Sequence, residues 1–249
     1  MTQEKTHYDY IRAIGETRYT ARNYLEKCWN RYYFKTYSYV LDKMLGDVTG
    51  RSVLDVGTSH GAWFEFFKRK QFSAIYGAEI DSGRAKLAKA CGYDEIYNCD
   101  ASMVPIKACT IDYAVSNDVF VHILRLEDKI AVLKKMEDIL KPGGAFIFNH
   151  PVSRAFGYKN YKVDGSCSFL SLQELIAMVT KNTGFEIDDI KPTFFKFRNM
   201  RRNFFCRSLK YLMIMMPFGS DILFLADYIN SRKSGMQDSD TIYLKLVKK

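Results

Sequence analysis

Four residues at alternate positions, Asp55, Gly57, Ser59 and Gly61, follow a short apolar run and are suited to binding a ligand. Glycine adopts positive φ without steric cost, so this spacing predicts a tight turn whose backbone can approach a ligand closely. The apolar run predicts a buried parallel strand, and the residues after the turn predict a helix. The first N–H groups of that helix lack partners within it and face the turn. Residues 51–67 therefore predict a strand, turn and helix that together bind a ligand.

A carboxylate at the end of the next expected strand is a candidate for the same site. Glu79 closes an apolar stretch at 74–80 and lies 22 positions after Gly57. An acid at about this separation in a dinucleotide-binding fold accepts hydrogen bonds from ribose hydroxyls. The two carboxylate oxygens can accept both hydroxyl protons. Glu79 is therefore predicted to bind the ribose of a nucleoside.

Two further acids lie near the ends of strands. Asp81 is expected to cap a helix at 82–91 through its side chain. Asp100, followed by the small residue Ala101, comes directly after a third strand expected at 95–99. From the residues alone, Asp100 fits a ligand contact and an acid that merely ends a strand equally well.

Three polar residues follow a fourth strand expected at 110–116, namely Asn117, Asp118 and His122. Asp118 and His122 are four positions apart, so they would share one face if a helix begins here. His150 follows a fifth strand, and the carboxyl ends of strands are where open α/β sheets bind their ligands. His122 and His150 are competing candidates for a general base, and for His122 a packing role is the alternative.

The order of these features resembles that of class I S-adenosylmethionine (SAM)-dependent methyltransferases, in the branch that includes small-molecule O-methyltransferases. Residues 55–61 match the motif D-x-G-x-(G/S)-x-G, with Ser59 at the middle glycine position. Residues 118–122, D-V-F-V-H, resemble the family's E-V-x-E-H, but Val121 replaces the second acid and so puts a metal site in doubt. Residues 140–144, L-K-P-G-G, precede an apolar strand as in the family.

The resemblance implies that the cofactor is SAM and that the product is S-adenosylhomocysteine. It implies cofactor-binding roles for Asp55, Gly57, Ser59, Gly61, Glu79, Asp100, Ala101 and Asn117, with Asp100 and Ala101 at the adenine. With the positions at the strand ends, the predicted catalytic residues are His150, His122 and Asp118. We expect no metal, because Val121 replaces the second acid of the family's stretch and the cysteines lack metal-ligand spacing. The N-P-P-(Y/F) motif of enzymes that methylate adenine amino groups is absent from the end of the fourth strand.

The expected fold class is α/β, a Rossmann-like, seven-stranded, mostly parallel sheet with helices on both faces and an antiparallel last strand. We expect four segments: an N-terminal helical cap at 1–50, a SAM-binding core at 51–190, a helical insertion at 191–240 and the last strand at 241–249. The cap is predicted from aromatic residues at helical spacing, which suit packing on the sheet or covering the cofactor.

Composition indicates a globular protein, with 47% hydrophobic and 26% charged residues. The N-terminus has no basic region followed by an apolar run, so we expect a cytoplasmic protein without a secretory signal. The net charge of +9 is concentrated between 191 and 220, a stretch without acids. Its seven bases are Lys191, Lys196, Arg198, Arg201, Arg202, Arg207 and Lys210.

The expected insertion mixes these bases with aromatic residues and methionines. Proline, glycine and aspartate interrupt its apolar part, which argues against a membrane span. The alternatives are a lid over the substrate, a helix peripheral to the anionic inner face of a membrane, and a homodimer interface. Nucleic acid is a less favoured partner because no RNA-binding motif is present.

The predicted function is methyl transfer from SAM to a small-molecule, sugar or lipid-linked acceptor, at oxygen. A hydroxyl acceptor requires a base more than an amine does, and the two histidines near strand ends favour oxygen. One alternative is an RNA or protein methyltransferase that docks through the basic C-terminal segment. Another is a SAM-binding protein without catalysis, whose insertion binds a membrane or a partner.

Overall fold

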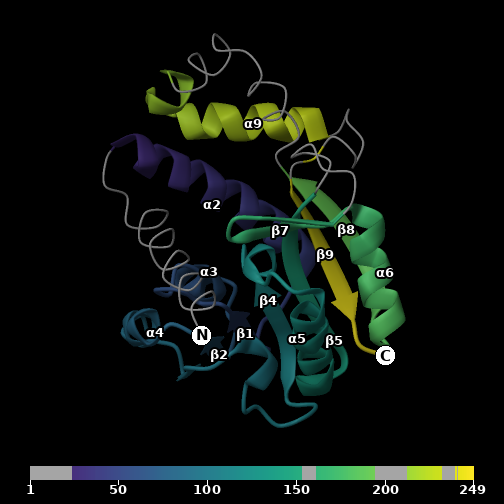
Figure 1. Cartoon of the computed structure of the whole chain (residues 1–249). Coiled ribbons are helices and arrows are strands. Elements are labelled where there is room, and N and C mark those ends of the chain that lie inside the picture. Colours follow the sequence, from purple (N-terminus) through teal and green to yellow (C-terminus); the bar gives the residue numbers. More distant parts are fainter. Residues whose placement is uncertain (1–23, 153–160, 194–211, 232–238, 240) are drawn as a thin grey trace.

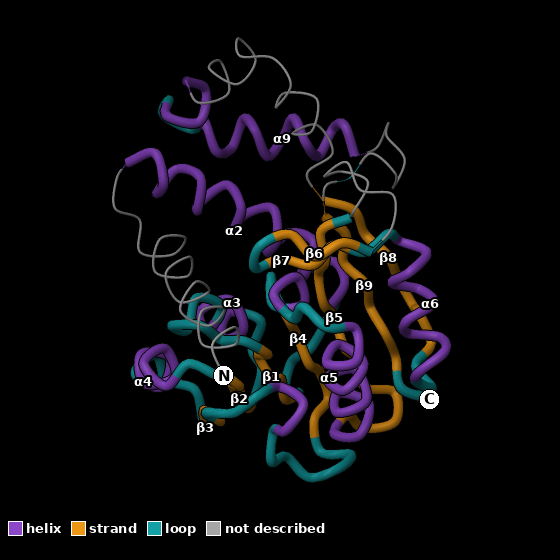
Figure 2. The backbone as a smooth tube through the Cα atoms, viewed as in Figure 1, coloured by secondary structure: helices purple, strands orange, loops and turns teal. Residues whose placement is uncertain are grey.

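The computed structural model of the protein describes residues 24–152, 161–193, 212–231, 239 and 241–249 (Figure 1). Seven strands of this part form one sheet (Figure 2). Their order across the sheet is β3 (Glu95–Tyr97), β2 (Ala74–Ala78), β1 (Ser52–Val56), β4 (Ile111–Ser116), β5 (Leu140–Pro151), β9 (Thr241–Val247) and β8 (Glu186–Thr193). The first five are parallel to one another, whereas β9 is antiparallel to both β5 and β8. The predicted fold class is confirmed.

Helices cover both faces of the sheet (Figure 1). One face carries α2 (Tyr24–Leu45), α3 (Phe64–Arg69), α4 (Ser82–Lys89) and α9 (Gly219–Ser231), and the other carries α5 (Leu126–Ile139) and α6 (Leu172–Asn182). β5 shows why both faces are apolar. Its Phe146 and Phe148 belong to the core beneath α5 and α6, whereas Ile147 between them belongs to the core beneath α2. The strand alternates between two buried layers, as expected of a strand covered on both sides.

The predicted N-terminal cap and insertion meet on one side of the molecule. α2 and α9 run alongside each other in Figure 1, and the ring centroids of Tyr39 and Phe224 are 5.4 Å apart. Of the expected insertion at 191–240, the first three residues continue β8, and 212–231 include α9. Six of its seven predicted bases, at 196–210, lie outside the described residues.

A short hairpin was not predicted from the sequence. It consists of β6 (Lys162–Asp164) and β7 (Cys167–Phe169), which pair antiparallel around Gly165 at φ +59°. Strands of three residues are too short to show an alternating pattern. The hairpin packs beside a 3-10 turn, η2 (Phe120–His122), at the end of β4.

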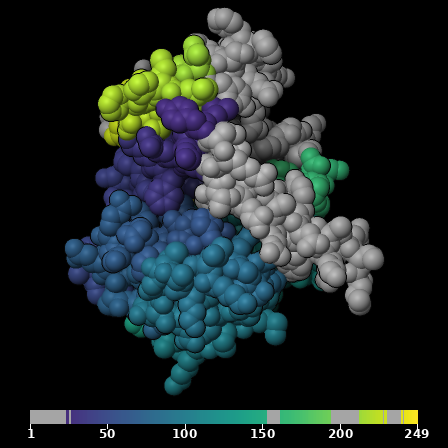
Figure 3. Space-filling view, turned by 90° about the vertical axis from the view of Figure 1, so that its left-hand side faces the viewer, coloured from purple at the N-terminus to yellow at the C-terminus, as the bar shows by residue number. Residues whose placement is uncertain are grey.

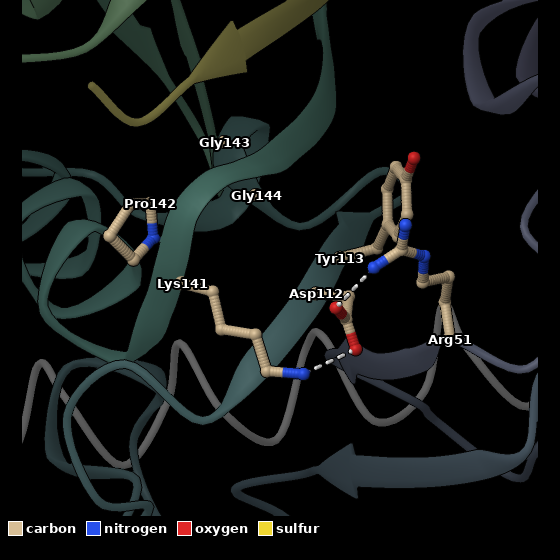
Figure 4. A pocket seen from close by; sticks show the side chains of 7 residues that line it. All are labelled: Arg51, Asp112, Tyr113, Lys141, Pro142, Gly143 and Gly144. Carbon is tan, nitrogen blue, oxygen red and sulfur yellow. Dashed lines mark hydrogen bonds and ion pairs between the residues drawn. The ribbon is translucent and has the colours of Figure 1, made fainter.

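At the amino ends of the strands, Asp112 joins β1, β4 and β5 in a surface pocket of about 280 Å³ (Figure 4). Its carboxylate accepts hydrogen bonds from the Ser52 N–H at 3.0 Å, the Ser52 hydroxyl at 2.7 Å and Lys141 Nζ at 2.9 Å, and Arg51 forms a longer ion pair at 3.4 Å. Burial raises the pKa of the Asp112 carboxyl, but the hydrogen bonds from Lys141 and Ser52 outweigh it and lower that pKa to about 2. A Cβ at Gly144 would lie 2.8 Å from the Lys141 carbonyl oxygen, so this turn requires its glycine.

Candidate active site

The turn after β1 has the backbone that its sequence predicts. Gly57 and Gly61 have φ values of +77° and +88°. A Cβ at Gly57 would lie 2.3 Å from Val119 Cγ2, and one at Gly61 would lie 2.6 Å from Cys91 Sγ. Ser59 has a φ of +52°, so the serine adopts the left-handed conformation at the position of the family's middle glycine. The turn therefore keeps a left-handed backbone at this position despite the substitution.

Glu79 lies at the carboxyl end of β2 and is held against this turn. Its side chain is buried, and its Oε2 and Oε1 accept hydrogen bonds from the Ser59 N–H at 2.8 Å and the Asp81 N–H at 2.9 Å. Burial raises the pKa of the Glu79 carboxyl, and these two hydrogen bonds oppose the shift. Each oxygen has a second lone pair that can accept a hydroxyl proton. The predicted N-cap is confirmed, because the Asp81 side chain accepts a hydrogen bond from the Arg84 N–H.

Asp55 is more deeply buried than a ligand contact requires. It is 1% exposed, and its Oδ2 accepts a hydrogen bond of 2.6 Å from the Tyr93 hydroxyl. Burial raises the pKa of the Asp55 carboxyl to about 7, against the effect of the Tyr93 hydrogen bond. Asp55 thus joins β1 to the segment before β3, and its predicted contact with a cofactor stays a prediction.

Asp100 and Ala101 lie at the carboxyl end of β3, near Glu79. The Asp100 side chain is exposed and caps a 3-10 turn, η1 (Ala101–Met103), by accepting hydrogen bonds from the Ser102 N–H at 2.8 Å and the Ser102 hydroxyl at 2.6 Å. Asn98, which sequence reasoning missed, donates to the Glu79 carbonyl oxygen at 2.8 Å. This bond joins the ends of β2 and β3 along one edge of the sheet.

Asn117 and Asp118 follow β4 on the same edge. Asn117 is 7% exposed, and its Oδ1 accepts a hydrogen bond of 2.6 Å from the Tyr243 hydroxyl. Its Nδ2 has no hydrogen-bond partner within the described part of the chain. A buried amide donor without a partner is costly, so this atom marks a position where a ligand can accept a hydrogen bond.

Asp118 is the centre of a hydrogen-bond network that joins three elements. Its N–H donates to Asn149 Oδ1 at 2.6 Å, and its Oδ1 accepts from Asn149 Nδ2 and from the Tyr37 hydroxyl, both at 3.1 Å. Tyr37 comes from α2 and Asn149 from β5. Asp118 has a φ of +59°, and the chain continues into η2 rather than into an α-helix. The predicted shared helical face of Asp118 and His122 is therefore wrong, because the left-handed residue redirects the backbone.

A pocket of about 570 Å³ opens beside Asp118, between α2 and the glycine turn. Its aromatic lining comes from α2 and from Trp63, the residue before α3, and its cationic lining residues are Arg31, Lys35 and Arg69. The lining residues are Asn30, Arg31, Tyr33, Phe34, Lys35, Tyr37, Ser38, His60, Ala62, Trp63, Arg69 and Asp118. Burial, together with the Arg84 charge, lowers the pKa of His60, which keeps its ring neutral near pH 7. The pocket brings a carboxylate and a neutral imidazole close to the predicted cofactor turn.

The two histidines predicted as bases lie elsewhere. His122 is next to the β6–β7 hairpin, where its Nδ1 is 3.1 Å from the Ser166 carbonyl oxygen. His150 is fully buried, and its Nδ1 is 2.7 Å from the Pro151 carbonyl oxygen. Burial, followed by the Lys129 charge of α5, lowers the pKa of His150 well below its usual range. Because side chains alternate along β5, His150 faces α5, whereas Asn149 faces the Asp118 network.

Three residues of this region were missed by sequence reasoning. Tyr37 was predicted only as part of the aromatic face of a cap helix, and Asn149 only as a residue after a strand. His60 lies inside the glycine motif at a variable position, so the motif carries no signal for it. In the N-H-P sequence at 149–151, the residue that contacts Asp118 is Asn149, one position before the histidine that was predicted.

Comparisons with known proteins agree with this architecture. A family model described as "Methyltransferase domain" matches residues 29–190, more than half of the chain. A search of curated proteins found no match. Among solved structures, an S-adenosylmethionine dependent methyltransferase from Mesorhizobium loti is 14% identical, with a TM-score of 0.57 and coverage of 84% of this chain and 96% of that chain.

Two further solved structures have the same fold. Geranyl diphosphate C-methyltransferase from Streptomyces coelicolor is 14% identical, with a TM-score of 0.57 and coverage of 86% of this chain and 77% of its own. A chain from the complex of the Haloferax volcanii Trm112 methyltransferase activator with a putative methyltransferase is 13% identical, with a TM-score of 0.59 and coverage of 86% and 90%. From the family match and this shared fold, the chain belongs to the methyltransferase domain family and is a SAM-dependent methyltransferase.

Proposed function

We propose that the protein methylates a hydroxyl oxygen of a small molecule bound in the pocket beneath α2, and that Asp118 accepts the hydroxyl proton. The observation that carries this proposal is the position of Asp118, which lines the pocket at the carboxyl end of β4 and is oriented by Tyr37 and Asn149. In open α/β sheets this end of the strands is where ligands bind.

The residues around the glycine turn fit the cofactor. Gly57 and Gly61 let the turn pack closely against Val119 and Cys91. Glu79 offers carboxylate lone pairs, and Asn117 Nδ2 is a buried donor without a described partner. Glu79 would bind the ribose, Asp100 and Ala101 the adenine, and Asn117 the amino acid portion. When bound, SAM supplies a sulfonium methyl group that is already activated by its positive charge.

The work left to the protein is therefore to position an acceptor and receive one proton. Tyr37 and Asn149 donate to the same Asp118 oxygen, which fixes the plane of the carboxylate. An acceptor hydroxyl that donates to Asp118 has its lone pair directed away from the carboxylate. With SAM bound, the oxygen–carbon bond would form as the carbon–sulfur bond of the sulfonium breaks and S-adenosylhomocysteine leaves, and Asp118 would receive the hydroxyl proton. His60, neutral near pH 7, is the second candidate base because it lines the same pocket.

The lining of the pocket favours an acceptor with an apolar body and an anionic group. Tyr33, Phe34 and Trp63 provide aromatic surface, and the rings of Phe34 and Trp63 stack with centroids 4.5 Å apart. Arg31 and Arg69 supply positive charge at the rim. A volume of about 570 Å³ is in the range of pockets for small ligands. A lipid-linked sugar or prenyl phosphate has this chemistry, and the S. coelicolor relative was crystallised with geranyl diphosphate.

The first test is calorimetric titration with S-adenosylhomocysteine, followed by methylation assays with radiolabelled SAM. The acceptor panel contains hydroxylated aromatics, sugar phosphates, lipid-linked sugars, geranyl diphosphate, RNA and a protein extract. We expect binding of S-adenosylhomocysteine and O-methylation of a small anionic acceptor. Methylation of RNA or protein, or of a prenyl carbon, would contradict the proposed acceptor or atom. No turnover with any acceptor, despite binding, would favour a protein without catalysis.

The role of Asp118 is tested with Asp118→Asn. Asparagine tolerates the left-handed conformation, so the backbone and the affinity for S-adenosylhomocysteine should be retained. Loss of a general base typically lowers kcat by about 100- to 10,000-fold. Asp128→Asn, at an exposed position of α5, is the matched control. If kcat falls further in His60→Gln than in Asp118→Asn, His60 is the group that accepts the proton, and the assignment of Asp118 as the base is refuted.

A further inference from the structure

One side of α9 carries apolar side chains that face solvent. Ile222, Leu225 and Ile229 are 43%, 55% and 48% exposed, and Phe218 just before the helix is 78% exposed. The spacing of Ile222, Leu225 and Ile229 by three and four residues places these three on one side of the helix, and Phe218 precedes it at a φ of +63°. We call these four residues the α9 stripe. Met215 and Met216, both 45% exposed, extend the apolar surface before the helix.

The opposite side of α9 is packed against the protein. This packing fixes the orientation of the helix and holds the stripe toward solvent. Leu223 is 5% exposed within the core beneath α2. Tyr228 and Phe224 make edge contacts with Tyr39 of α2, and Asp221 forms an ion pair with Lys35. Figure 3 shows α9, in yellow-green, at the surface beside the dark purple α2. Single exposed apolar residues are common, but a continuous stripe marks an interface.

The charge of the chain identifies the partner. The net charge is +9, and the sequence between 191 and 220, which leads directly into α9, contains seven bases and no acid. Of these seven, the structure describes Lys191. An apolar helical stripe next to a polybasic sequence suits the surface of an anionic bilayer, where apolar side chains insert among the head groups and bases attract the lipids. A second copy of this chain carries the same net charge of +9 and would be repelled.

We propose that the α9 stripe docks the protein onto an anionic lipid bilayer as an interfacial helix. No helix in the described part of the chain is long and apolar enough to cross a membrane. Lys35 lines the acceptor pocket and pairs with Asp221 of α9, so the docking helix lies next to that pocket. The bilayer contact itself does not depend on which acceptor is methylated.

The test is cosedimentation of the full chain with two kinds of vesicle, one of phosphatidylcholine alone and one of phosphatidylcholine with about 30% phosphatidylserine. The phosphatidylserine supplies the negative surface potential that attracts basic segments. We expect binding to the anionic vesicles, weaker binding at higher salt, and little binding to the neutral ones. The variant Leu225→Ser/Ile229→Ser removes two stripe residues, which should lower the vesicle partition coefficient about tenfold.

The matched control is Leu87→Ser/Met103→Ser, at two apolar positions away from α9 that are 60% and 74% exposed. It should bind vesicles as the unchanged protein does, and titration with S-adenosylhomocysteine verifies that both variants are folded. Absence of binding to anionic vesicles, or equal binding by the stripe variant, would overturn the proposal. So would a dimer in sedimentation velocity that dissociates in the stripe variant without any vesicle binding, since the stripe would then join two copies of the chain.

Discussion

Replacement of Glu79 by glutamine tests the link between the glycine turn and the cofactor. The Glu79 oxygens accept from two backbone N–H groups, those of Ser59 and Asp81, at 2.8 and 2.9 Å. Glutamine has the same shape but offers one carbonyl oxygen and one NH₂ group. One of these two part-buried N–H groups would therefore face a donor and lose its partner.

The magnitude follows from this geometry. A hydrogen bond to a charged group contributes about 1.5–3 kcal/mol. Burial raises the pKa of the Glu79 carboxyl, so neutralising the side chain returns part of that amount. We expect a net destabilisation of about 1–2 kcal/mol, which lowers the Tm of a domain of this size by about 2–8 °C. If the carboxylate also binds ribose hydroxyls, loss of about 1.4–2.8 kcal/mol weakens S-adenosylhomocysteine binding about 10- to 100-fold.

Two measurements separate the effects. Differential scanning calorimetry gives the Tm, and isothermal titration at 15 °C gives the affinity where the variant is folded. Glu65→Gln, at an exposed position of α3, is the control and should change neither. A lower Tm with unchanged affinity would refute the ribose assignment but keep the structural role of Glu79. An unchanged Tm would refute the hydrogen-bond argument itself.

Two other predictions concern ionisable groups away from the proposed acceptor pocket, Asp112 and Lys129. The folded-state pKa of Asp112 is about 2, below its ordinary value of 3.8, so its contribution of about 2 kcal/mol is complete above pH 4 to 5 and is lost as pH falls toward 2. Urea unfolding should show Asp112→Asn less stable by about that amount at pH 7 and by about half of it at pH 3; an equal difference at both pH values would contradict the low pKa. Lys129 is fully buried, and burial lowers its pKa to about 7, so between pH 7 and its ordinary 10.5 only the unfolded chain binds this proton and stability rises with pH. From pH 7.5 to 9.5 the unchanged protein should gain about 2 kcal/mol that Lys129→Met does not gain. Lys134→Met, exposed on the same helix, should follow the unchanged protein, and a parallel response of Lys129→Met would show that Lys129 is not the group responsible.

Features that depend on a few neighbouring residues could be predicted from the sequence. The turn at 57–61, the N-cap at Asp81 and the glycines at 143–144 are set by steric limits on φ and by hydrogen bonds within a few residues. The sheet was predicted from the order of apolar runs and breaks together with the resemblance to a known family, and parallel strands buried on both faces leave few other arrangements.

What only the tertiary structure decided is which side chains meet at the pocket. Asp118, Tyr37 and Asn149 come from three segments up to 112 positions apart, counted from 37 to 149, and no local pattern links them. His150 was expected at the site, yet it faces α5 because each step along a strand reverses the side chain. Asn149 reaches Asp118 for the same reason. Sequence therefore determined the local backbone of the predicted cofactor turn, whereas long-range packing and strand faces determined which residues lie beside the pocket.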